Sequence, residues 1–120
     1  MERYQLVYND FMAKYSKTET SPAQVGEILA GIAGFFPNYN NTLVVVEHAY
    51  ALVHKTIAES SDDLTGKAIS SAKADVIAEA TPEALEFKKA KAHVENIEML
   101  IGALKFLQKS LEVEYANSNI

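Results

Sequence analysis

Three histidines have the broadest chemistry of any residues in this chain, because an imidazole can bind a metal or transfer a proton near neutral pH. His48 and His54 are six residues apart, which places them on different sides of a helix. The Glu-x-x-His spacing of helical di-iron sites and the H-E-x-x-H spacing of zinc sites both fail at every histidine. In the first case the required positions hold Val45, Ala51 and Ala90. The sequence therefore predicts no metal site and no cofactor.

The one local positive cluster consists of Lys88, Lys89, Lys91 and His93. Such a cluster can bind a phosphate or an acidic partner. Glutamates bracket it at close helical spacing and can form intrahelical pairs, which is typical of an ordinary solvated helix face. Both interpretations stay open, and these four residues are the candidate anion-binding site.

The segment Thr65-Gly66-Lys67-Ala68 resembles the end of a phosphate-binding P-loop. That motif needs a glycine five residues before its second glycine and a hydroxyl residue after its lysine, whereas Ser61 and Ala68 stand there. The segment therefore predicts a turn that enters a helix. Asp62 and Asp63 lack the alternating ligands of a calcium loop, so we expect them to support the N-terminal end of the following helix.

Residues for covalent catalysis are missing as well. The chain has no cysteine, which excludes disulfides, thiolate metal sites and a cysteine nucleophile. Its serines lie in no nucleophile-elbow motif. The sequence therefore predicts that the protein is not an enzyme.

Helical spacing organises the first third of the chain. Aromatic rings share one face of a first helix at Tyr4, Tyr8, Phe11 and Tyr15. Ser21-Pro22 then has the capping pattern that begins a second helix, which we expect to end at Pro37. This helix has an apolar side and a small-residue side made of Gly26, Ala30 and Gly34, where a neighbouring backbone can approach closely. Residues 38–41 are expected to form a turn.

Two further helices are expected before residue 81. The run Leu43 to Val46 favours a strand by composition, but its apolar spacing continues helically to Ile57, and we interpret it as a helix. The polar residues 60–63 are expected to separate this helix from the next one. The alanine-rich segment 64–80 is expected to be a slender helix whose stripe contains Ile69, Ala72, Val76 and Ala80.

The last helix has the clearest pattern. Thr81-Pro82 repeats the cap-then-proline signal and predicts a helix from Pro82 to about Asn117. An apolar seam with steps of three and four runs along it for about four heptads, which is more than a short neighbouring helix covers. We expect this seam to form an oligomer or partner interface through Val94, Ile97, Ile101, Leu104, Gln108, Leu111 and Tyr115.

Together these elements predict one all-α domain over residues 1–120, a helical bundle of four to five helices with a long C-terminal helix. The net charge of −5 argues against an extended nucleic-acid surface. The most apolar stretch, 25–36, is too short to cross a membrane and contains Glu27. The N-terminal residues do not resemble a secretory signal, so we expect a cytoplasmic protein.

Several segments resemble small all-helical proteins encoded by bacteriophages and prophages of Bacteroides-type bacteria. The segments that carry the resemblance are Pro22 to Ile28, Asn38-Tyr39-Asn40, Gly66-Lys67-Ala68, Lys73-Ala74 and the run His93 to Gln108. The resemblance implies a gene placed among phage early genes for DNA replication, recombination or interference with host defence. It implies no site residues.

The leading hypothesis is therefore a cytoplasmic helical interaction protein, a homo-oligomer that binds a host or phage protein. The alternative is an anti-defence protein that sequesters a small anionic nucleotide signal or inhibits a host nuclease or defence complex. An enzyme ranks last, because no acid, base, nucleophile or metal ligands come together in the sequence.

Overall fold

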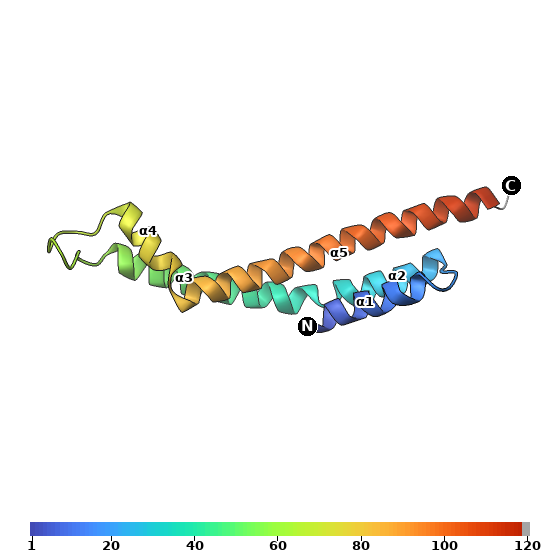
Figure 1. The fold of residues 1–120 in the computed structure, drawn as a ribbon, viewed down its shortest axis with the longest axis horizontal. Coiled ribbons are helices and arrows are strands. Elements are labelled where there is room, and N and C mark those ends of the chain that lie inside the picture. The colour runs from blue at the N-terminus through green and yellow to red at the C-terminus, as the bar shows by residue number, and fades with distance from the viewer. Residues whose placement is uncertain (119–120) are drawn as a thin grey trace. The chain divides into compact units, whose positions relative to one another are not determined.

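The computed structural model describes residues 1–118, and these form five helices without a regular strand (Figure 1). The helices are α1 (Arg3–Tyr15), α2 (Pro22–Ala33), α3 (Phe36–Ala58), α4 (Ser71–Glu79) and α5 (Pro82–Ser118). The all-α class and the long C-terminal helix are confirmed. Packing contacts divide the described chain into two compact units, one formed by residues 1–37 and 95–118 and the other by residues 38–94. Whether the chain folds as one domain stays a prediction.

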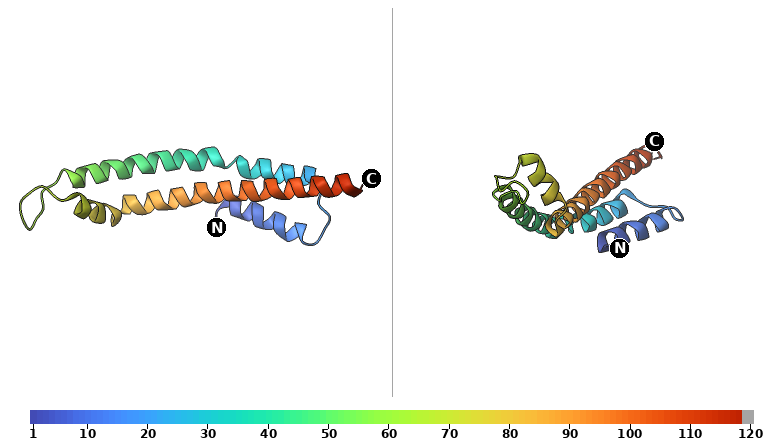
Figure 2. Two further views of the ribbon diagram at one scale, coloured as in Figure 1. Left: turned by 90° about the horizontal axis from the view of Figure 1, so that it is seen from above. Right: turned by 60° about the vertical axis from the view of Figure 1, so that its left-hand side comes forward.

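The first unit is built from α1, α2 and the C-terminal part of α5, which lie side by side in both views of Figure 2. Its core contains Tyr4 and Phe11 from α1, Val25 and Ile32 from α2, and Ile97, Leu104 and Leu111 from α5, all buried. The predicted aromatic face of α1 and the predicted start of α2 are confirmed. Ser21 and Gln24 form a reciprocal capping box, which satisfies backbone donors at the start of α2.

The second unit is built from α3, α4 and the N-terminal part of α5. Segment 43–57 is helical, as its spacing predicted, but no residue of α3 is fully buried. Small side chains supply the core here: Ala74, Ala78, Ala84 and Ala90 are buried. Tyr50 of α3 packs on Phe87 of α5 with ring centroids 5.6 Å apart. Buried alanines let helices approach closely, but each removes little apolar surface from water. The packing of Tyr50 on Phe87 should therefore contribute much of the stability of this unit.

The boundary between α2 and α3 differs from the prediction. α2 ends at Ala33, α3 begins at Phe36, and residues 38–41 are helical, so the predicted end at Pro37 and the turn that followed it are wrong. Pro37 instead occupies the first turn of α3. Proline is well tolerated there, because the first N–H groups of a helix have no intrahelical partner.

The fourth helix is shorter than predicted. Residues 59–70 form a loop, and α4 begins only after Ser70, whose hydroxyl accepts a hydrogen bond from the Lys73 amide at 3.2 Å. The predicted stripe is also wrong, since Val76 is 69% exposed. The side chains that α4 buries are Ala74 and Ala78.

Among the described residues, no helix combines the length and apolarity needed to cross a lipid bilayer.

Candidate functional site

The most prominent exposed apolar feature of the first unit is a stripe along α5. Met99, Phe106 and Val113 are 64%, 76% and 53% exposed, and their spacing of seven residues places them on one helix face. Between Met99 and Phe106 lie the exposed small residues Gly102 and Ala103. We call these five residues the α5 stripe. A Cβ atom built at Gly102 would meet nothing within 4 Å, so the centre of the stripe is open.

Two shallow hollows lie next to the α5 stripe and are partly lined by its residues. A shallow hollow of about 350 Å³ is lined by Phe106, Lys109, Ser110 and Val113. Met99 borders a second hollow, of about 290 Å³, whose other walls include Tyr4 and Tyr8 of α1. A side chain of a docking helix therefore has space on either side of Gly102.

The seam predicted as an interface lies mainly on the inner face of α5. Val94, Ile97, Leu104 and Leu111 are buried, Ile101 is half-buried, and Tyr115 is 44% exposed. Gln108 donates a hydrogen bond from Nε2 to the Pro22 carbonyl at 3.2 Å. That these seven residues contact a partner stays a prediction, but most of them already contribute to packing within their own chain.

The α5 stripe was missed in the sequence, although its signal was present there. Met99, Phe106 and Val113 form a heptad repeat of their own, but the seam from Phe87 to Tyr115 is longer and richer in aliphatic residues. Sequence spacing alone does not tell which of two apolar faces the rest of the chain covers.

The structure divides the candidate anion-binding cluster. Lys88, Lys89 and Lys91 are exposed. The Lys89 ammonium lies 3.7 Å from a Glu86 carboxylate oxygen, an exposed pair that contributes little to stability. His93 is half-buried, and its ring lies 5.4 Å from that of Tyr39. Lys89 is therefore close to a carboxylate, whereas His93 packs against an aromatic ring.

Two members of the cluster do share a hollow. Lys88 and Lys91, one turn apart, line a space of about 220 Å³ together with Tyr50, Glu79, Ala84 and Phe87. Two ammonium groups next to two rings suit a small anion, whereas Glu79 in the same wall opposes one. Typical ligand pockets measure about 300–1,000 Å³, so this hollow is small.

One of the three histidines, His54, has a carboxylate partner. His54 Nε2 lies 2.7 Å from Asp75 Oδ1, and both side chains are exposed. A carboxylate in this position orients an imidazole, as it does in general-base dyads. Within residues 1–118, however, no three histidine or carboxylate side chains gather as a metal site.

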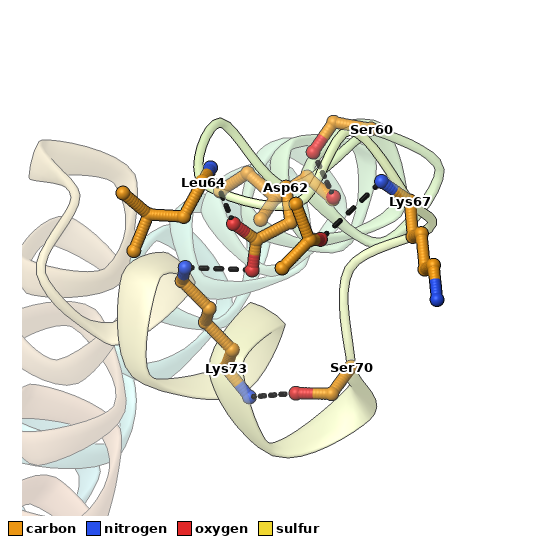
Figure 3. A network of polar contacts seen from close by, with 8 residues as sticks. Ser60, Asp62, Leu64, Lys67, Ser70 and Lys73 are labelled. Atoms are coloured by element: carbon orange, nitrogen blue, oxygen red, sulfur yellow. Dashed lines mark hydrogen bonds and ion pairs between the residues drawn. The ribbon is translucent and has the colours of Figure 1, made fainter.

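Asp62 organises the loop between α3 and α4 (Figure 3). Its Oδ1 accepts a hydrogen bond from the Leu64 amide, and its Oδ2 accepts one from Lys73 Nζ, both at 2.8 Å. These contacts, with the Lys73 bond the largest cause, lower the pKa of the Asp62 carboxyl below its ordinary value. Gly66 allows the tight turn because its φ of +69° is in the left-handed region.

Backbone hydrogen bonds within the loop hold it together. The Asp62 amide donates to the Lys67 carbonyl at 2.6 Å, and the Gly66 amide donates to the Asp62 carbonyl at 2.7 Å. The backbone amides that a phosphate would need are thus partly engaged within the loop. Ser70 is the N-cap of α4, and Asp62 supports the same helix end through Lys73, as predicted. No contact of Asp63 with α4 is recorded among the described residues.

Searches for relatives found no matching family model, no matching curated protein and no matching solved structure.

Proposed function

We propose that this chain is a non-enzymatic helical interaction protein that self-associates through α5 and acts by binding a host or phage protein. The observation that carries the proposal is the α5 stripe: three large apolar side chains are more than half exposed on one face of one helix. Single exposed apolar residues are common on protein surfaces, but an ordered series of them is typical of an interaction face. The resemblance to phage-encoded proteins supports a phage origin.

Self-association is tested by sedimentation velocity from low to high micromolar concentration. We expect the wild type to shift from monomer towards dimer. Phe106→Gln should remain monomeric while keeping the wild-type helical circular dichroism, because the ring it removes is 76% exposed and contributes little to the fold. Leu6→Gln is the matched control, since Leu6 is also an apolar residue that is 52% exposed but lies on α1 rather than on the stripe. A wild type that stays monomeric throughout would refute the proposal.

Binding to a second protein is tested by affinity capture from phage-infected cells, with wild type and Phe106→Gln compared side by side. A protein retained by the wild type and lost from the variant supports binding through α5. Equal recovery of every protein with both baits counts against the stripe as the binding surface.

A second candidate function is sequestration of a small anionic signal, as an anti-defence protein would perform it. The hollow between Lys88 and Lys91, with the Tyr50 and Phe87 rings beside it, favours this candidate. Its size suits a phosphate group better than a whole nucleotide. Thermal shift with inorganic phosphate, ADP-ribose and cyclic dinucleotides tests it, with Lys88→Gln as the variant and Lys89→Gln as the matched control. No shift with any of these compounds would exclude it.

A further inference from the structure

We infer that the α5 stripe binds the α5 stripe of a second copy of this chain, in antiparallel orientation, with the two-fold axis between Gly102 and Ala103. This inference rests on the proposed self-association and specifies its geometry. It depends on two independent features, the symmetric placement of Met99 and Phe106 about the centre of the stripe and the charges along one edge.

Two of the three large apolar side chains, Met99 and Phe106, are placed symmetrically about the centre of the stripe, whereas Val113 would face Ala92 of the second copy. Met99 lies three residues before Gly102, and Phe106 lies three residues after Ala103. When a second α5 runs in the opposite direction across this centre, Met99 of each copy faces Phe106 of the other. Small residues at the crossing permit close approach of the two backbones, as they do in small-residue helix contacts. The space at Gly102 is open in the single chain, so nothing has to move.

The charges specify the direction. Glu98 and Lys105 are seven residues apart and therefore lie on the same edge of the stripe. Neither has an opposite charge three or four residues away on its own helix, and neither takes part in an ion pair that the structure records within residues 1–118. Both charges are thus available to a second chain.

In an antiparallel pair each edge meets the same edge of the other copy, so Glu98 of one copy comes close to Lys105 of the other, twice. In a parallel pair this edge would instead meet the edge that contains Ala103 and Ser110, which carry no charge. Complementary charges fix orientation and register in helix pairs. The charges beside the stripe therefore favour the antiparallel over the parallel orientation of two copies.

The size of the stripe predicts a weak dimer. From Met99 to Val113 the helix is about 21 Å long at 1.5 Å per residue. A strip of that length and one helix wide is well below the roughly 800 Å² per partner of standard interfaces. We therefore expect dissociation in the micromolar range.

Because the chain has no cysteine, single cysteines report the geometry directly. In the antiparallel pair residue 103 lies next to residue 103 of the second copy, within the Cα separation of up to about 7 Å that a disulfide needs. Residue 110 lies about 22 Å along the axis from its counterpart. We expect Ala103→Cys to form a disulfide dimer under mild oxidation, and the matched control Ser110→Cys to remain monomeric on the gel.

The outcomes separate this inference from the proposed function. If the wild type sediments as a dimer but Ser110→Cys cross-links as readily as Ala103→Cys, the antiparallel geometry is refuted and self-association stands. If the wild type dimerises and neither cysteine cross-links, the crossing at Gly102 is refuted. If the wild type is monomeric at every concentration, both proposals fall.

Charge reversal gives a second, independent readout that leaves the apolar stripe intact. Glu98→Lys and Lys105→Glu should each weaken dimerisation about tenfold, because each replaces two exposed attractive pairs by repulsive ones. The double variant restores the two pairs with their signs exchanged, so it should regain wild-type dimerisation. A double variant weaker than both single variants would refute the pairing of Glu98 with Lys105.

Discussion

At the scale of single residues, Asp62 shows how one carboxylate can order a loop that has almost no apolar core. Its side chain is only 14% exposed although the surrounding loop is largely exposed. Both carboxylate oxygens accept hydrogen bonds, one from the Leu64 amide two residues away and one from Lys73 Nζ eleven residues away. The second contact ties the loop to α4, so the charge of Asp62 should matter for how the second unit holds together.

Asp62→Asn should therefore destabilise this loop in a pH-dependent way. The pKa of Asp62 is lowered in the folded state, so its stabilising effect is present above the unfolded pKa of about 3.9 and is lost as the pH falls through the lower folded value. At neutral pH the variant should show faster exchange of the Leu64 and Gly66 amides and a lower Tm than the wild type. The difference in Tm should shrink as the pH is lowered below about 4.

Asp63→Asn is the matched control, because Asp63 is exposed and no interaction of its side chain is recorded. Equal exchange rates in both variants would show that the ion pair with Lys73 does not order the loop.

At the scale of helices, the helix starts that depend on local capping residues were predicted correctly, whereas boundaries that depend on tertiary contacts were not. Ser21 and Thr81 mark the starts of α2 and α5 correctly, because a cap forms within three residues and does not depend on the rest of the chain. Pro37 was misassigned because proline fits both the region after a helix end and the first turn of the next helix. The start of α4 was misplaced because alanine favours helix throughout 64–80, whereas the contact of Asp62 with Lys73 is not visible in a spacing pattern.

The small-residue side of α2 is an element-scale prediction that the structure refines. A Cβ atom built at Gly26 would lie 2.8 Å from Gln108 Nε2, which confirms a close approach there. The other two predicted positions, Ala30 and Gly34, are exposed, and a Cβ atom built at Gly34 meets only carbonyl oxygens of α2 itself, so the predicted close approach does not extend to them. Gly31, which is not part of the predicted side, is also open, since a Cβ atom built there meets nothing within 4 Å. Gly31→Ala should therefore raise the free energy of unfolding by about 0.5–1 kcal/mol through helix propensity.

Gly26→Ala should gain less than Gly31→Ala, or lose stability, because the new methyl group displaces the Gln108 amide from its hydrogen bond to the Pro22 carbonyl. Urea unfolding of the two variants measures the difference. Equal stabilisation by both substitutions would contradict the packing of α2 against α5 at this point.

At the scale of the whole molecule, α5 has two apolar faces with different roles, and only one of them could be assigned from the sequence. The seam through Ile97 and Leu104 was found because its spacing is regular and aliphatic, yet its burial by α1 and α2 depends on where those helices pack. The stripe through Phe106 became visible only as the face that they leave uncovered. The candidate lysine cluster likewise followed from the sequence, but its division between the hollow and Glu86 required the three-dimensional arrangement.

The two faces of α5 predict two kinds of thermal behaviour. Ile97 is fully buried, so Ile97→Ala should lower the free energy of unfolding by about 2–4 kcal/mol at every protein concentration. Dimerisation involves only folded chains and therefore stabilises the folded state by mass action. The wild-type Tm should accordingly rise with protein concentration. Phe106→Gln should match the wild-type Tm at low concentration and lose this rise, while the control Leu6→Gln on α1 keeps it. A Phe106→Gln variant whose Tm is already depressed at low concentration would instead place Phe106 in the core of its own chain.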